Sequence, residues 1–185
     1  MYKYLGCISF AVFFVIGCKT SPKLETVEAT DNAGYTERYS RRKSDFAKEG
    51  LYVKIDPQGN KVEEAQFSSD TLHGFRILYY ENGDTQIVES YQMGGFEGDY
   101  KVYYPGGQLK MLGKYEDNVM TGKWKIYYEN GGLKEVVTFK NNQENGPFVE
   151  YHPNGNLKAE GTYLNGDYEQ GELKLYDENG KHIKT

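Results

Sequence analysis

The sequence predicts an all-β fold, an elongated antiparallel meander of six β-hairpin repeats of about 24 residues each. Three columns of residues share this period. A glycine marks each repeat, a second glycine follows nine residues later, and in the first five repeats an aromatic residue stands seventeen positions after the mark. The marks are Gly50, Gly74, Gly98, Gly122, Gly146 and Gly171, the second glycines are Gly59, Gly83, Gly107, Gly131, Gly155 and Gly180, and the aromatics are Phe67, Tyr91, Tyr115, Phe139 and Tyr163.

The repeat at residues 122–145 shows why each unit is expected to be a hairpin. Trp124, Ile126 and Tyr128 stand at a spacing of two, which is the period of a strand whose side chains alternate between its faces. Asn130-Gly131 follows and predicts a type I′ turn, in which both central residues have positive φ. Residues 133–139 are rich in Val, Thr and Phe and predict the second strand. No apolar set recurs at the helical period of about 3.6 residues, so a helix is a poor alternative.

The repeat domain is expected to occupy residues 50–185. Its repeats are residues 50–73, 74–97, 98–121, 122–145, 146–170 and 171–185. A single hairpin is marginally stable in water, so neighbouring repeats have to cover one another in one continuous array.

Residues 1–17 predict a lipoprotein signal peptide. Lys3 provides a positive start, and residues 8–17 form an apolar run that is too short to span a bilayer core of about 30 Å. The run ends in Val15-Ile16-Gly17-Cys18, which resembles a bacterial lipobox. The resemblance implies cleavage before Cys18, lipidation of that cysteine, and anchoring in the bacterial cell envelope, with the outer membrane as the expected location. The alternative is a plain secretory signal followed by an incidental cysteine.

Residues 18–49 lack the repeat pattern and are rich in Thr, Ser, Glu, Lys and Arg. We expect the lipidated Cys18 and a flexible tether here, holding the repeats away from the bilayer. Residues 50–185 contain fourteen Lys and Arg against twenty-one Asp and Glu. This acidic balance argues against nucleic acid as a partner and against broad binding to anionic lipid, because both would be repelled.

The sequence offers little for catalysis. The three histidines, His73, His152 and His182, lie in different repeats and have no metal-ligand spacing. No nucleophile elbow or phosphate-binding loop is present, and paired carboxylates such as Glu63-Glu64 are expected to be solvated. We therefore expect no enzyme activity, no cofactor and no metal.

Tyrosine is unusually abundant in this chain, with 18 residues. Adjacent strand residues point to opposite faces, so each face receives its own row of rings. The row with Tyr100, Trp124 and Phe148 is expected to pack as the core. The other row is a candidate binding strip, called the tyrosine strip below. Its members are Tyr79, Tyr103, Tyr127, Tyr151 and Tyr176. The alternative is that both rows serve only in cross-strand packing.

The pattern at residues 98–109 and 122–133, G-x-aromatic-x-aliphatic-Tyr-Tyr followed by a turn and Leu, resembles the MORN-repeat variant of bacterial YwqK-type antitoxin proteins. The resemblance covers residues 50–185 and implies a non-catalytic array of β-hairpins. The antitoxin label implies that some members bind and neutralise a toxin. The second repeat departs from the pattern with Phe75-Arg76, and the fifth has Tyr151-His152 where others have two tyrosines.

These observations predict an envelope-anchored, non-catalytic repeat lipoprotein that binds another protein, in the manner of an antitoxin or immunity factor. A glycan-binding or cell-wall-binding module is the first alternative, because tyrosine rings also stack on sugars. A structural spacer is the second.

Overall fold

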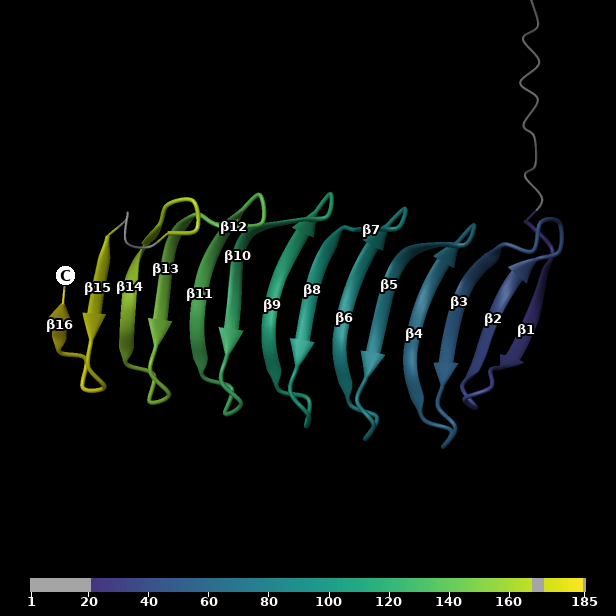
Figure 1. Cartoon of the computed structure of the whole chain (residues 1–185), viewed down its shortest axis with the longest axis horizontal. Coiled ribbons are helices and arrows are strands. Elements are labelled where there is room, and N and C mark those ends of the chain that lie inside the picture. The colour runs from purple at the N-terminus through teal and green to yellow at the C-terminus, as the bar shows by residue number, and fades with distance from the viewer. Residues whose placement is uncertain (1–20, 168–171, 185) are drawn as a thin grey trace, which may run out of the picture.

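The computed structural model describes residues 21–167 and 172–184. Within them the chain forms one long antiparallel sheet whose strands follow the order of the sequence (Figure 1). The short strands β7 and β12 lie off this path and pair with β6 and β11. The strands are β1 (Leu24–Thr30), β2 (Thr36–Arg42), β3 (Lys48–Ile55), β4 (Lys61–Ser68), β5 (Thr71–Tyr79), β6 (Thr85–Gln92), β7 (Gly95–Phe96), β8 (Gly98–Tyr103), β9 (Leu109–Glu116), β10 (Val119–Tyr127), β11 (Leu133–Lys140), β12 (Gln143–Glu144), β13 (Gly146–Tyr151), β14 (Leu157–Tyr163), β15 (Leu173–Tyr176) and β16 (His182–Lys184). The all-β meander predicted from the repeats is confirmed.

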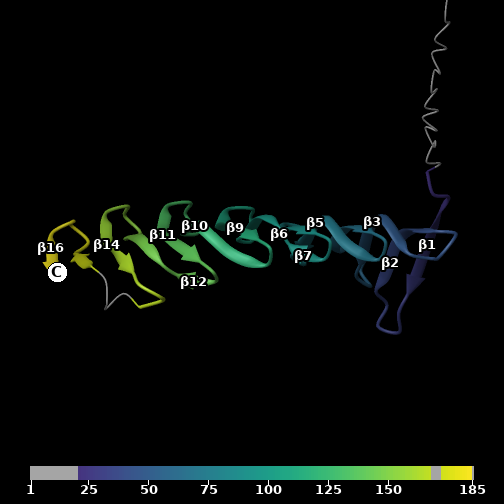
Figure 2. The ribbon, with the colours of Figure 1, turned by 90° about the horizontal axis from the view of Figure 1, so that it is seen from above.

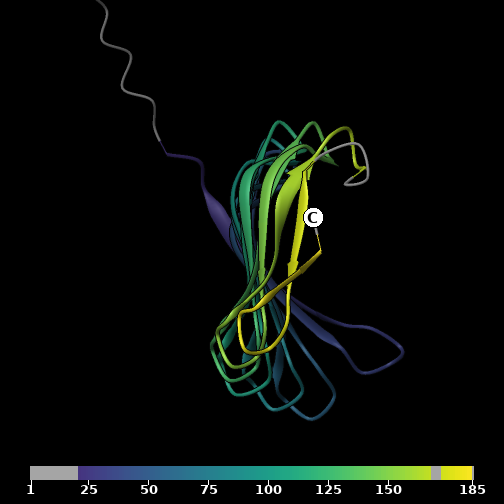
Figure 3. The same ribbon diagram turned by 90° about the vertical axis from the view of Figure 1, so that its left-hand side faces the viewer.

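The sheet is a single layer, as the view from above shows (Figure 2). Seen from its end, it is curved, and successive strands rotate relative to one another (Figure 3). This rotation is the ordinary twist of β-sheets, accumulated over the whole array. No second layer covers the sheet within the described residues, so the burial seen there comes from side chains of neighbouring strands that pack over one another.

The prediction of a flexible tether over residues 18–49 is wrong for the part that the structure describes. Residues 24–30 and 36–42 are β1 and β2, which add one more hairpin to the array. Its turn matches the turn of the first predicted repeat. Asp31 Oδ1 accepts the N–H groups of Ala33 and Tyr35 at 2.9 and 3.0 Å. Asp56 Oδ1 accepts from the corresponding two residues of its own turn at 2.9 and 2.8 Å.

Two further predictions for the N-terminal region concern residues 1–18. The signal peptide at residues 1–17 and the lipidation site at Cys18 lie outside the described residues. The hairpin was missed because residues 24–49 lack the repeat's glycine mark and its aromatic column, although they keep the turn glycine, Gly34, which has φ +87°.

The predicted type I′ turn at Asn130-Gly131 is also wrong. Only Gly131 has positive φ, and its N–H donates to the carbonyl of Tyr128 at 2.9 Å. The side chain of Asn130 accepts the N–H of Gly132 at 2.9 Å and so holds Asn130 outside the left-handed region. This arrangement is the three-residue hairpin loop that ends in a left-handed glycine. Two consecutive residues with positive φ occur instead in the connections between repeats, as at Asn141 and Asn142.

In the part of the chain that the structure describes, the mark glycines lie in bulges. Gly122 has φ +68°, and beside it three residues of β10 lie opposite one residue of β9. Gly74 has φ +109° and lies beside a comparable shift between β4 and β5. Bulges bend the strand that carries them and increase its local twist. The regular glycine column of the sequence therefore gives the array its repeated curvature.

The core lies on one face of the sheet, called the core face below. Trp124, Val137, Phe148 and Ala159 form its buried cluster, and Trp124 is 2% exposed. The ring centroid of Tyr100 lies 5.8 Å from that of Trp124. The predicted packing of this aromatic row is confirmed. Gly113 lies directly against the Trp124 ring, and a Cβ at this position would overlap it.

Candidate functional site

The tyrosine strip lies on the face opposite the core, called the outer face below. Cross-strand pairing establishes this, because residues directly opposite each other in a sheet share a face. Ile77 pairs with Glu64 and Val88. Glu64 in turn accepts a hydrogen bond from the Tyr79 hydroxyl at 2.6 Å. Tyr79 therefore lies on the same face as Ile77, which is the outer face, and opposite to Arg76 on the core face.

The tyrosines of the strip alternate with leucines. Tyr103 pairs with Leu109, and the next two repeats place their leucines in the same way. These pairs are Tyr127 with Leu133 and Tyr151 with Leu157. All six side chains are half-buried. The leucines were not predicted as part of the strip, although each one closes the repeated Tyr-Tyr-x-Asn-Gly-x-Leu pattern or its variant.

The two ends of the strip are held by carboxylates. The Tyr79 hydroxyl donates to Glu64, and the Tyr176 hydroxyl donates to Glu160 at 2.9 Å. Burial, followed by the hydrogen bond to Glu64, raises the pKa of Tyr79 to about 12. The hydrogen bonds from Lys61 and then Tyr79 lower the pKa of Glu64. These end tyrosines already have polar partners within the chain.

The three central tyrosines differ from the ends. Within residues 21–167 and 172–184, the hydroxyls of Tyr103, Tyr127 and Tyr151 have no hydrogen-bond partner. Their rings are supported by the flanking leucines, while the hydroxyl groups remain free to bond to something else. Tyrosine at a recognition surface typically presents this combination of an apolar body and a polar tip.

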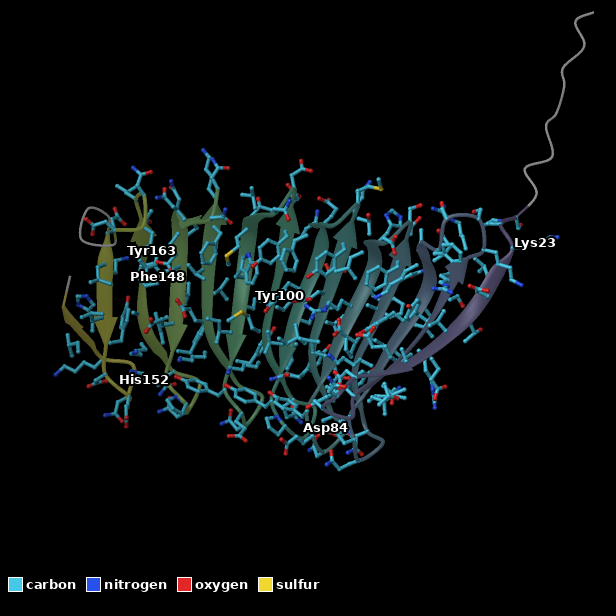
Figure 4. The ribbon with its side chains drawn as sticks, turned by 45° about the vertical axis from the view of Figure 1, so that its right-hand side comes forward. Lys23, Asp84, Tyr100, Phe148, His152 and Tyr163 are labelled. Carbon is cyan, nitrogen blue, oxygen red and sulfur yellow. The ribbon has the colours of Figure 1, made fainter. Side chains whose placement is uncertain are left out.

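The second residue of each Tyr-Tyr pair has a structural role. Its side chain reaches into the next repeat and bonds to the backbone carbonyl of the strip tyrosine there, so each repeat fixes the strip of the following one. The pairs are Tyr80 to Tyr103 at 2.8 Å, Tyr104 to Tyr127 at 3.0 Å, Tyr128 to Tyr151 at 2.7 Å, and His152 Nε2 to Tyr176 at 3.1 Å. His152 lies at the end of the strands that carries the hairpin turns (Figure 4). We call this set the carbonyl ladder.

The outer face is basic in its middle repeats, although the repeat domain is acidic. Lys101 and Lys125 both lie opposite Leu112, next to the strip. Lys101 is in a salt bridge with Asp99 at 3.2 Å. Lys123 and Lys125 are exposed, and neither is in a salt bridge among the described residues. The central part of the strip therefore combines tyrosine, leucine and free positive charge.

A polar cluster interrupts the core face at Arg76, which stands in its repeat where later repeats have Tyr100, Trp124 and Phe148. Arg76 Nε donates to Glu63 at 2.7 Å, and Nη1 donates to Glu89 at 3.3 Å. Glu89 is 6% exposed and also accepts from Tyr91 at 3.0 Å. Burial opposes the charge of Arg76, but Glu63 and Glu89 hold its pKa above the usual value. Burial and then Glu89 raise the pKa of Tyr91 to about 12. The members of this cluster satisfy one another, which is a structural arrangement.

The described residues offer no catalytic or metal-binding arrangement. No group of three or more His, Cys, Asp and Glu side chains in this part of the chain is placed to hold a metal ion. The hollow of about 350 Å³ next to Met93, Phe96 and Asn118 is open. In the same residues, no helix is long and apolar enough to cross a membrane.

The comparison with protein families identifies the repeat type. Residues 96–117, 120–141, 144–165 and 169–185 each match the family described as MORN repeat variant. Each match begins two residues before a mark glycine, so it agrees with the period found in the sequence. A comparison with curated proteins finds no similar sequence.

Proposed function

This chain is a MORN-like repeat protein, and from that premise we propose that it is a non-catalytic binding module that recognises another protein. MORN repeats are often protein-binding or membrane-binding modules. The proposed contact surface is the central part of the tyrosine strip, at Tyr103, Tyr127 and Tyr151.

One observation carries this proposal: the three central hydroxyls have no partner in the described chain, while the side chains next to them in the sequence, Tyr104, Tyr128 and His152, are all bonded in the carbonyl ladder. A half-buried ring loses little conformational entropy on binding, because its neighbours already restrict it. The free hydroxyl then supplies directional bonding to a partner. Neighbouring strands lie roughly 4.8 Å apart, so Tyr103 and Tyr151 are about 20 Å apart across the sheet. A surface of that length fits a protein partner.

The positive charge on the outer face indicates which kind of protein surface would bind there. Lys123 and Lys125 are exposed without acidic partners in the described chain. A protein that presents apolar side chains together with carboxylates would complement this part of the strip. We propose a toxin-like protein as the specific form of this partner, which would make the chain an antitoxin or immunity-like factor.

We also propose that the array is held at a membrane of the bacterial cell envelope, the outer membrane being the expected one, through lipid on Cys18. The motif at residues 15–18 supports this proposal. Only a short segment then separates Cys18 from the first strand, since β1 begins at Leu24. In cell fractionation, Cys18→Ser is expected to move the protein from the membrane fraction to the soluble fraction. Retention of the variant in the membrane fraction would contradict lipid anchoring at this residue.

The test of the binding proposal is capture from a native envelope extract with the immobilised full-length chain, followed by mass spectrometry. The triple variant Tyr103→Ser, Tyr127→Ser, Tyr151→Ser is expected to lose the captured protein while keeping its β-sheet circular dichroism spectrum. A triple Tyr→Phe variant at the same positions keeps the rings and removes only the hydroxyls. We expect it to weaken capture as well, and it covers the case in which the serine variant does not fold.

Capture that survives in both triple variants would show that the tyrosine strip is not the contact surface. Co-sedimentation of the chain with purified wall polymer, in the absence of any captured protein, would favour the glycan-binding alternative. A chain that retains neither protein nor polymer would be a structural spacer.

A further inference from the structure

The array has an open edge at β1, which lies at the right of Figure 1. In the described chain, this seven-residue strand pairs with β2 alone. The pairing of β1 with β2 keeps one register along the whole strand. In the hairpin of β3 and β4, by contrast, the pairing register shifts next to the turn. The strand contains no lysine, proline or bulge, which are three of the devices that protect a sheet edge, and its two glutamates, Glu25 and Glu28, are in salt bridges with Arg41 and Arg38 of β2. Such an edge can accept another strand.

The backbone groups at this edge follow from the bonding at the two ends of β1. The Asp31 N–H donates to the carbonyl of Tyr35, and the Lys43 N–H donates to the carbonyl of Lys23, both at 2.9 Å. Bonded and non-bonded pairs alternate along an antiparallel ladder. The odd-numbered residues of β1 therefore bond to β2. The even-numbered residues direct their N–H and C=O groups to the open edge, and these are Leu24, Thr26, Glu28 and Thr30.

We propose that β1 pairs with β1 of a second copy of this chain, antiparallel, around a two-fold axis at Val27. This register brings the outward groups together in bonded pairs, Leu24 with Thr30 and Thr26 with Glu28, each occurring twice. It gives roughly eight backbone hydrogen bonds, two for each bonded pair. A two-fold interface requires a surface that is complementary to itself, and in this register the seven-residue strand is self-complementary along its whole length.

The side chains favour the same register. Thr26 lies opposite Glu28 of the second copy, and Glu25 lies opposite Ala29, so no two carboxylates meet across the interface. An axis at Glu28 would place this residue directly opposite its own copy, which is unfavourable for like charges. An axis at Thr26 would leave the outward groups of Thr30 without a partner.

The interface also continues the core. Val27 lies opposite Tyr39, which lies opposite Tyr52 on the core face. Tyr52 is 6% exposed, whereas Val27, at the end of this row, is only half-buried. Pairing at the proposed axis places the two Val27 side chains in contact and joins the two core rows. Leu24, which is 45% exposed on the other face, gains a neighbour in Thr30 of the second copy.

Sedimentation velocity of the full-length chain in mild detergent tests this proposal. The wild type is expected to dimerise with increasing concentration. Thr26→Lys places a positive charge opposite Glu28 of the second copy at two symmetric positions, and we expect the dimer to become about 2- to 30-fold tighter. Thr26→Glu is the matched control of opposite sign, and it should weaken the dimer by a similar factor.

Thr26→Pro tests the backbone pairing. The Thr26 N–H points to the open edge. Proline at this position therefore removes one interface hydrogen bond from each copy of the dimer and no hydrogen bond between β1 and β2. We expect dimerisation at least about tenfold weaker with an unchanged β-sheet spectrum. A wild type that stays monomeric at every concentration would overturn the proposal. If Thr26→Lys and Thr26→Glu both weaken the dimer, Thr26 lies opposite Thr26 of the second copy, and the proposed register is wrong. If none of the three substitutions changes dimerisation, β1 is not the interface.

Discussion

The carbonyl ladder is expected to be a main source of cohesion between repeats, and tyrosine-to-phenylalanine substitutions measure it. In the triple variant Tyr80→Phe, Tyr104→Phe, Tyr128→Phe, each change removes one hydroxyl that donates to a backbone carbonyl of the next repeat at 2.7–3.0 Å. A neutral hydrogen bond contributes about 0.5–1.5 kcal/mol to stability after exchange with water. Successive ladder residues lie two strands, or roughly 10 Å, apart, so their effects are expected to add. The triple variant should lose about 2–4 kcal/mol.

The same chain offers a matched control. The three central tyrosines of the strip, Tyr103, Tyr127 and Tyr151, stand next to residues of the carbonyl ladder, but their hydroxyls have no partner in the described chain. Phenylalanine at Tyr103, Tyr127 and Tyr151 should therefore change the free energy of unfolding by less than about 0.5 kcal/mol. Urea unfolding followed by circular dichroism compares the two triple variants. Equal losses in both, or no loss in the ladder variant, would refute the assignment of structural and free hydroxyls.

Three further predictions concern the core face. Gly113→Ala should destabilise the chain by about 1–3 kcal/mol, because the added Cβ overlaps the Trp124 ring, and an unchanged urea midpoint would contradict this packing. Arg76→Met should cost about 2–4 kcal/mol in the same assay, because a buried carboxylate loses its partner, whereas Arg76→Lys should cost less. Glu135 lies directly opposite Glu150, and burial followed by the charge of Glu150 raises the pKa of Glu135. The pKa of Glu135 is higher in the folded state than in the unfolded state, so the folded state binds the proton more tightly. The free energy of unfolding therefore falls as the pH rises from the unfolded pKa through the folded pKa. Glu135→Gln should therefore stabilise the chain by about 0.2–1 kcal/mol at pH 7 and make unfolding less dependent on pH, and equal pH profiles would contradict the like-charge pair.

The fold could be predicted because each repeated residue type encodes a local geometry. Among the described residues, glycine at the marks adopts positive φ in bulges, and the aromatic column fills one face of a single-layer sheet. The N-terminal hairpin escaped prediction because it keeps only the turn, and strand formation there depends on pairing with β3. The turn type was wrong because the Asn130 side chain bonds locally to Gly132, a competition that the dipeptide does not reveal.

The site was only partly predictable. Alternation placed the two tyrosines of each pair on different faces, and the structure has Tyr127 on the outer face and Tyr128 in the carbonyl ladder. Alternation does not show which of the two hydroxyls is bonded within the chain. Which hydroxyl is bonded depends on where a carbonyl of the next repeat lies, more than twenty residues further along the chain. The flanking leucines could have been found by extending the strand alternation past the turn.

The single-layer architecture makes the length of the array proportional to its number of repeats. Extensive contacts in the described chain join only strands that are neighbours in the sheet, so no repeat depends on a distant one for its packing. Gain or loss of one repeat would change the length of the array by roughly 10 Å and leave the remaining units intact. The carbonyl ladder keeps each added unit in step with the one before it. The length of the sheet surface, in whole repeats, can therefore change without a change of fold.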